Sequence, residues 1–171
     1  MSKSTQETLP PQTAIDQIIG LYNEGQLEQT VSLAESLANQ YPNAQILFDI
    51  LGAAYMGLKN TDKTIKSYQN VLQLNPSHSD AYNNMGLVLY DQDRFEEAVE
   101  SYQKAVEIEP DFADAHYNLA NSLKDLDKLN EAILSYTHAV NLNPNYFEAH
   151  YNLGNSLHDA DRLDEAEASY R

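Results

Sequence analysis

The sequence predicts an all-α fold, an α-solenoid of antiparallel helix pairs, and three observations support this prediction. Four of the six prolines recur at intervals of 34 residues, at Pro42, Pro76, Pro110 and Pro144. Apolar residues recur twice within each interval with the spacing of a helix face. Small residues return at two fixed places in the interval. A constant period of this length is typical of repeat proteins, in which each repeat buries its apolar face against its neighbours.

A short lead-in precedes the repeats. Residues 1–10 are polar, end in proline and lack the apolar segment of a secretory signal, so we expect them to be disordered. Residues 11–171 then form a single domain of five repeats, at 11–44, 45–78, 79–112, 113–146 and 147–171. The fifth repeat is incomplete because the chain ends inside its second helix, which favours a fragment of a longer array.

The third repeat shows most clearly how each interval forms two helices. Its first apolar set has the spacing i, i+3, i+4, i+7 and comprises Tyr82, Met85, Gly86 and Leu89. Its second set comprises Ala98, Tyr102 and Ala105. Each set lies on one face of a helix. The proline that follows ends the second helix, because proline lacks the amide hydrogen that would continue the helical hydrogen bonds.

Two further positions define the turn and the helix crossing. Between the helices of the third, fourth and fifth repeats lie Asp93, Asp127 and Asp161, and Gly25 is the equivalent in the first repeat. Aspartate and glycine both tolerate the left-handed backbone of a tight turn. Small residues recur on the first helices (Gly52, Gly86, Ala120 and Gly154) and on the second helices (Ala98, Ala132 and Ala166). We therefore expect the helices to approach closely there, where a larger side chain would cost ~1–3 kcal/mol.

The order of these positions resembles the tetratricopeptide repeat family. The third repeat meets that pattern with Tyr82, Met85-Gly86, Leu89, Ala98, Tyr102, Ala105 and Pro110. The second and fourth repeats follow it, with His116 in place of the usual large apolar residue, and His150 makes the same replacement in the fifth. The first repeat is degenerate, as expected of a terminal cap. The resemblance implies a right-handed superhelix whose first helices line a concave surface.

Composition restricts the partners. The 26 acidic and 10 basic residues give a net charge of −16, which disfavours nucleic acid and anionic membranes and favours a basic or neutral protein or peptide. The chain has no cysteine, so disulfides and thiolate metal sites are excluded. No apolar run approaches the ~18 residues of a membrane span, and we expect a cytoplasmic location.

Asparagines recur on the face opposite the apolar side of the first helices. The first asparagine column comprises Asn84, Asn118 and Asn152, and the second comprises Asn121 and Asn155. An asparagine amide both donates and accepts, so it can pair with the backbone of an extended peptide, at ~0.5–1.5 kcal/mol for each pairing. The columns resemble the asparagine ladder in the repeat arm of O-linked N-acetylglucosamine transferases. The alternative is that these side chains bond between neighbouring repeats.

Acidic and aromatic residues flank the asparagine columns. An acidic column, Asp91, Asp125 and Asp159, lies late in the first helices, where the helix dipole disfavours anions. We expect it to select basic ligands. An earlier set, Asp80, Asp114 and Glu148, is explained by the dipole alone. Tyr117 and Tyr151 lie beside the columns, where they either stack on a ligand side chain or pack between repeats.

No pattern in the sequence indicates catalysis. His116 and His150 are one repeat apart, but no carboxylate or cysteine recurs with them at ligand spacing, so we expect hydrogen-bonded structural histidines and no metal site. No phosphate-binding loop, nucleophile elbow or carboxylate pair occurs. We expect neither enzymatic activity in this chain nor a cofactor.

The predicted function is a non-catalytic protein-interaction scaffold that binds its partner on an acidic, asparagine-lined concave face. One alternative is the substrate-recruiting arm of a larger enzyme, such as a glycosyltransferase, with a catalytic domain beyond Arg171. Another is end-to-end self-association through the incomplete fifth repeat, which we expect to expose Leu153, Leu157, Leu163 and Ala166.

Overall fold

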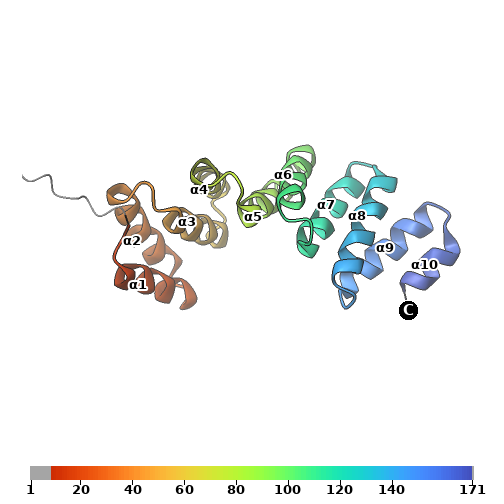
Figure 1. The fold of residues 1–171 in the computed structure, drawn as a ribbon, viewed down its shortest axis with the longest axis horizontal. Helices are drawn as coiled ribbons and strands as arrows, with labels where there is room; N and C mark the ends of the chain where they lie inside the picture. The colour runs from red at the N-terminus through yellow and green to blue at the C-terminus, as the bar shows by residue number, and fades with distance from the viewer. Residues whose placement is uncertain (1–8, 171) are drawn as a thin grey trace, which may run out of the picture. The chain divides into compact units, whose positions relative to one another are not determined.

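The computed structural model describes residues 9–170, which form ten α-helices and no strand (Figure 1). The first five helices are α1 (Gln12–Asn23), α2 (Leu27–Gln40), α3 (Gln45–Gly57), α4 (Thr61–Leu74) and α5 (Ser79–Tyr90). The next five are α6 (Phe95–Ile108), α7 (Ala113–Asp125), α8 (Leu129–Leu142), α9 (Phe147–Asp159) and α10 (Leu163–Ser169). The all-α prediction is confirmed. We expected residues 1–10 to be disordered, and residues 1–8 of this lead-in lie outside the described range.

The helices belong to two compact units, which are described separately. The N-terminal unit extends to Ala81 and the C-terminal unit begins at Tyr82, so the boundary falls inside α5. In the N-terminal unit α2 packs against α1 and α3, and α3 packs against α4. In the C-terminal unit each helix from α6 to α9 packs against the next one along the chain. Each unit is therefore built from successive helix hairpins.

The turn within each hairpin has the left-handed residue that the sequence predicts. Asp93 and Asp127 both have φ of 56°, Asp161 has 59° and Gly25 has 74°. The next residue closes the turn, as when the Arg94 amide donates to the Leu89 carbonyl at 3.0 Å. This bond to the fifth residue back is typical of a helix C-terminus that ends in a left-handed residue. Lys59, with φ of 56°, takes this place in the second repeat, where the sequence offered neither glycine nor aspartate.

The repeated prolines end the second helices as predicted. The helices α2, α4, α6 and α8 each end two residues before a proline. The residue between them is no longer helical but still donates its amide to the helix, as Glu109 does to the Ala105 carbonyl at 2.9 Å. Since proline cannot donate in this way, the chain turns there and starts the next hairpin.

The small residues of the first helices lie against tyrosines of the second helices, which confirms the predicted close approach. A Cβ atom on Gly52 would lie 2.7 Å from the ring of Tyr68, and one on Gly86 would lie 2.6 Å from the ring of Tyr102. Both tyrosines are almost completely buried. The helix axes are therefore as close as a buried aromatic ring permits.

The fifth repeat buries most of the apolar residues that we expected it to expose. Leu153, Leu157 and Ala166 are 6%, 4% and 3% exposed, and only Leu163, at 55%, lies open to solvent. The expectation was wrong for the first three, because α9 packs against α8 on one side and against α10 on the other. Two turns of α10 suffice to cover the leucines of α9.

Candidate functional site

The first asparagine column lies in the C-terminal unit, on α5, α7 and α9. All three side chains are half-buried. The Asn118 amide nitrogen donates to the Asn83 side-chain oxygen at 3.1 Å. The Asn152 amide nitrogen donates to the Tyr117 hydroxyl at 3.2 Å and to the Asn121 side-chain oxygen at 3.3 Å. Asn118 and Asn152 thus form hydrogen bonds between repeats, the alternative that the sequence left open. In these bonds their amide nitrogens donate, and their own side-chain oxygens take no part.

The second asparagine column holds tyrosine hydroxyls in place. The side-chain oxygen of Asn121 accepts a hydrogen bond from the Tyr136 hydroxyl, and that of Asn155 accepts one from the Tyr170 hydroxyl at 2.8 Å. Tyr136 belongs to α8, the second helix of the same repeat as Asn121, whereas Tyr170 follows the last residue of α10 and is 50% exposed. Because Tyr136 is almost completely buried, its hydroxyl needs such a partner, and Asn121 thereby links α7 to α8.

The acidic column lies at the carboxyl ends of the first helices, and its three aspartates are exposed. The Tyr90 hydroxyl donates to a carboxylate oxygen of Asp125 at 2.5 Å. Burial raises the pKa of the Tyr90 hydroxyl, and the Asp125 carboxylate raises it further. The hydroxyl therefore stays protonated and partly compensates the unfavourable helix dipole at Asp125.

The two candidate tyrosines differ in their surroundings. Tyr117 is half-buried, and its ring centroid lies 5.9 Å from that of Tyr136 and 4.9 Å from that of Tyr146. Tyr151 is 62% exposed, with its ring 6.2 Å from that of Tyr170. Tyr117 is thus part of the packing between repeats, whereas Tyr151 presents most of its ring to solvent.

A pocket of about 330 Å³ lies where α7 and α9 meet. This aromatic pocket is lined by Tyr117, Phe147, Glu148, Tyr151 and Asn152. It brings together three of the candidate residues, two tyrosines and an asparagine, with an aromatic ring and a carboxylate that sequence analysis did not select as binding residues. Rings beside a carboxylate form an environment that suits a cationic or aromatic side chain.

Phe147 is the residue of this pocket that sequence analysis missed. Its side chain is 78% exposed, more than any other large apolar residue of the described chain. The signal was its place in the repeat: the equivalent first positions of earlier repeats hold Gln45, Ser79 and Ala113. An aromatic residue where the repeat requires none is informative, because large exposed apolar groups often mark interaction surfaces.

The histidines of the fourth and fifth repeats make structural hydrogen bonds. The Nε2 atom of His116 lies 3.0 Å from the Pro110 carbonyl oxygen, and that of His150 lies 3.2 Å from the Pro144 carbonyl oxygen. The His116 ring also stacks on His138, with centroids 5.1 Å apart. Burial lowers the pKa of His116 and the neighbouring His138 lowers it further, while the bond to the Pro110 carbonyl opposes this change.

Two negative findings complete the description of residues 9–170. Within that range no group of three or more histidine, aspartate or glutamate side chains is placed to hold a metal ion. None of its helices combines the length and the apolar character needed to cross a membrane.

Comparison with known proteins identifies related sequences and folds. The family model described as TPR repeat matches residues 52–93, 86–127 and 120–161. The structure of MamA 41-end from Desulfovibrio magneticus RS-1 is 21% identical, with a TM-score of 0.84 over 93% of this chain and 90% of that one. No curated protein matches the sequence.

Two other similar structures come from proteins with different names. YrrB, described as a TPR protein with an unusual peptide-binding site, is 18% identical, with a TM-score of 0.77 over 91% of this chain and 80% of that one. The pilF protein of Pseudomonas aeruginosa is 19% identical, with a TM-score of 0.81 over 93% of this chain and 72% of that one. At these identities the similarity establishes the fold, an α-solenoid of helix hairpins.

Proposed function

Because the chain belongs to the tetratricopeptide repeat family, we propose that it is a non-catalytic scaffold that binds a protein partner. Its C-terminal unit holds an extended segment of that partner, carrying basic residues, on the exposed face of α7 and α9. The observation that carries this proposal is the aromatic pocket, in which the exposed rings of Phe147 and Tyr151 flank Glu148 and Asn152.

The pocket suits an arginine or lysine side chain. The aliphatic part of such a side chain packs on the rings, and its cationic end lies near the Glu148 carboxylate. A cation over an aromatic ring contributes ~0.5–1 kcal/mol at exposed sites. The net charge of −16 attracts basic segments from a distance and repels acidic ones.

The asparagine columns have a defined part in this proposal. The amide nitrogens of Asn118 and Asn152 are engaged between repeats, so their side-chain oxygens are the atoms that accept hydrogen bonds from peptide amides. Asn84 has neither of these contacts and offers both its donor and its acceptor. The acidic column then attracts basic residues further along the segment. The description of YrrB as a peptide-binding TPR protein supports this class of function.

The proposal is tested by measuring peptide binding with fluorescence anisotropy. The probe is a labelled nonapeptide of alternating arginine and alanine, and the control probe alternates glutamate and alanine. We expect the basic peptide to bind and Tyr151→Ala to weaken it about fivefold, which corresponds to a loss of ~1 kcal/mol. Glu148→Gln removes the carboxylate and should weaken binding to a similar extent, mainly at low salt.

Leu134→Ala is the matched control, because Leu134 is 60% exposed on α8, outside the aromatic pocket. Binding that survives both Tyr151→Ala and Glu148→Gln unchanged would exclude the pocket. Unchanged binding after combined replacement of Asn84, Asn118 and Asn152 by alanine would exclude the role of the asparagines.

Two alternative functions keep specific support. The asparagine columns fit the recruiting arm of a larger enzyme, in which the same face binds an enzyme substrate; assaying binding of unstructured substrate proteins tests this. The exposed Leu163 and Tyr170 fit self-association through the fifth repeat. A monomeric mass by light scattering at high protein concentration would count against that second alternative.

A further inference from the structure

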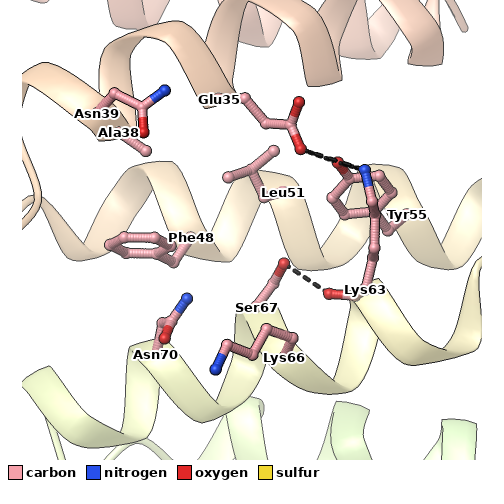
Figure 2. A pocket seen from close by; sticks show the side chains of 10 residues that line it. All are labelled: Glu35, Ala38, Asn39, Phe48, Leu51, Tyr55, Lys63, Lys66, Ser67 and Asn70. Atoms are coloured by element: carbon pink, nitrogen blue, oxygen red, sulfur yellow. Dashed lines mark hydrogen bonds and ion pairs between the residues drawn. The ribbon is translucent and has the colours of Figure 1, made fainter.

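The N-terminal unit contains a pocket of about 450 Å³ between α2, α3 and α4 (Figure 2). We call it the lysine pocket, and its lining residues are Glu35, Ala38, Asn39, Phe48, Leu51, Tyr55, Lys63, Lys66, Ser67 and Asn70. The side chains come from both second helices, α2 and α4, and from the first helix α3 between them (Figure 2). The lysine pocket is therefore separate from the aromatic pocket of the C-terminal unit.

The pocket combines an apolar surface with polar groups that lack partners. Phe48 and Leu51 form the apolar part. The Lys66 amino group and the side-chain amides of Asn39 and Asn70 make no hydrogen bond or ion pair with any residue of the described chain. Figure 2 shows Lys66 and Asn70 next to each other on α4, below Phe48, with Asn39 on the opposite side. These groups are thus available to a ligand that touches Phe48.

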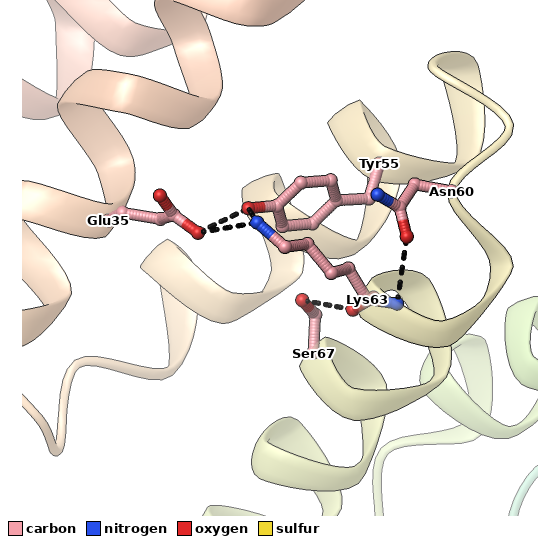
Figure 3. A network of polar contacts seen from close by, with 5 residues as sticks. All are labelled: Glu35, Tyr55, Asn60, Lys63 and Ser67. Atoms are coloured by element: carbon pink, nitrogen blue, oxygen red, sulfur yellow. Dashed lines mark hydrogen bonds and ion pairs between the residues drawn. The ribbon is translucent and has the colours of Figure 1, made fainter.

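A charge network at the other end of the pocket is internally balanced (Figure 3). The Lys63 amino group donates to the Tyr55 hydroxyl at 2.9 Å and to a Glu35 carboxylate oxygen at 3.3 Å, and the Tyr55 hydroxyl donates to the same oxygen. The Tyr55 hydrogen bond lowers the pKa of Glu35, and Lys63 lowers it further against the effect of burial. Glu35 is therefore ionised and neutralises Lys63, so Lys66 gives the pocket one unmatched positive charge.

The repeat does not require this arrangement. In the third repeat Glu97 and Glu100 replace Lys63 and Lys66, and in the fourth repeat Glu131 and Leu134 do so. Tyr55 is likewise specific to the second repeat, because Leu89 is its equivalent in the third. The chain has 10 basic residues among 171, and two of them line this one pocket.

We infer that the lysine pocket binds a carboxylate-bearing segment of a partner protein, in which an acidic side chain lies next to an apolar one. The Lys66 amino group pairs with the carboxylate, and the neighbouring Asn70 amide donates a hydrogen bond to it. The Asn39 amide, on the opposite side of Phe48 (Figure 2), donates to a backbone carbonyl of the same segment. The apolar side chain packs on Phe48 and Leu51. Charge complementarity favours this occupant, because a cationic, amide-rimmed pocket with an apolar surface fits an anion with an apolar neighbour. The chain then has two docking surfaces with opposite charge preference.

The inference is tested by NMR titration of the isotopically labelled full chain. The probe is a blocked octapeptide of alternating glutamate and leucine, and the comparison peptide alternates lysine and leucine. We expect the acidic peptide to shift the side-chain amide signals of Asn39 and Asn70 and the backbone amide of Phe48. Lys66→Glu, which installs the residue type of the third repeat, should raise the dissociation constant at least tenfold.

Lys128→Glu is the matched control, because it makes the same change of charge on an exposed residue of the C-terminal unit. It should leave the affinity for the acidic peptide within twofold. Asn70→Ala should weaken binding several-fold without loss of the amide signals that report folding.

Three outcomes would overturn the inference. The first is an acidic peptide that leaves Asn39, Asn70 and Phe48 unshifted. The second is Lys66→Glu binding the acidic peptide as tightly as the unchanged protein does. The third is the lysine–leucine peptide binding here equally well, which would mean that the pocket recognises only apolar surface. Because the residues and the peptide charge differ from those of the C-terminal site, failure here leaves the proposed function untouched.

Discussion

His116 illustrates how one residue replaces another within a repeat without loss of the fold. The pattern has a large apolar or aromatic residue at this position, as with Phe48 and Tyr82 in the second and third repeats. His116 fills the same space in a buried position and adds a hydrogen bond to the Pro110 carbonyl at 3.0 Å. The polar ring is thus accommodated because its donor meets the carbonyl at the preceding turn. The cost is a titratable group inside the packing between helices.

His116 should make folding sensitive to mild acid. Burial holds the pKa of His116 below its usual value, so the unfolded chain binds a proton on this group more readily than the folded chain does. Stability contributed by the neutral ring is present above about pH 6.5 and is lost as the pH falls through that value toward the lower pKa of the folded state. When the pH is lowered from 7.5 to 5.5, we expect the free energy of unfolding, measured with urea, to fall less for His116→Tyr than for the unchanged chain.

A substitution that changes no titratable group provides the control for this prediction. Leu134 is 60% exposed on α8, so Leu134→Ala should keep the pH dependence of the unchanged chain. Parallel pH profiles of His116→Tyr and the unchanged chain would show that His116 does not titrate differently in the folded state.

At the scale of the helix pair, the contact of a small residue with a tyrosine sets how closely two helices pack. The contact recurs at Gly52 with Tyr68, at Gly86 with Tyr102 and at Gly154 with Tyr170. In the fourth repeat the equivalent residues are Ala120 and Tyr136, and both are buried. The methyl group of Ala120 is therefore tolerated because the helix pair of the fourth repeat packs around it. At a glycine that already contacts a tyrosine ring, an added methyl group requires that ring to move.

Gly86→Ala should destabilise the protein. The new Cβ would lie 2.6 Å from the ring of Tyr102, which is only 1% exposed and has little room to move. Overpacking costs ~1–3 kcal/mol, and the better helix propensity of alanine returns up to ~1 kcal/mol, so we expect a net loss of about 1–2 kcal/mol in urea unfolding.

Gly154→Ala provides the matched comparison. Its facing ring, Tyr170, is 50% exposed and lies just after the last helix, so the ring can turn away and the helix propensity of alanine prevails. We expect this variant to be neutral or slightly stabilised. Equal losses for both variants would mean that ring mobility does not decide the outcome.

For the whole molecule, the dominant physical feature is the net charge of −16. The ion pairs of the described residues are few and most are exposed, such as Arg94 with Glu97 and Arg162 with Glu165, and exposed pairs contribute little each. Repulsion between acidic groups therefore exceeds attraction over the surface. The same field favours basic partners, and it confines acidic partners to places where a local positive charge is left unmatched.

Adding salt should stabilise the protein. Raising sodium chloride from 20 to 300 mM shortens the screening length to less than about 10 Å, which weakens the repulsion more than the few ion pairs. A gain of about 1 kcal/mol would raise the thermal unfolding midpoint by ~2–4 °C for a domain of this size. Sucrose at matched osmolality controls for effects of water activity. A midpoint that falls with salt would show that ion pairs outweigh repulsion.

The candidate site was predictable in part. Repeat register placed Tyr117, Tyr151 and Asn152 on one face, and the structure brings these three together in the aromatic pocket. Register could not show that the amide of Asn152 bonds to Tyr117 and Asn121 of the preceding repeat, because that depends on side-chain rotamers across two helices. Phe147 was missed because it departs from the repeat pattern, with Gln45, Ser79 and Ala113 at the equivalent positions, and the candidate residues were selected by recurrence. Whether these residues bind a peptide stays a prediction.

The sequence by itself determined the repeat period, the ends of the second helices and most of the tight turns. These features follow from backbone constraints that belong to single residues: proline cannot donate, and glycine or aspartate tolerates a left-handed turn. Only the tertiary structure decided that Leu153 and Leu157 are buried, that Phe147 is exposed, and that Glu35 neutralises Lys63 but leaves Lys66 unmatched. Each of these depends on side chains from different helices meeting in space, which residue spacing along one helix does not specify.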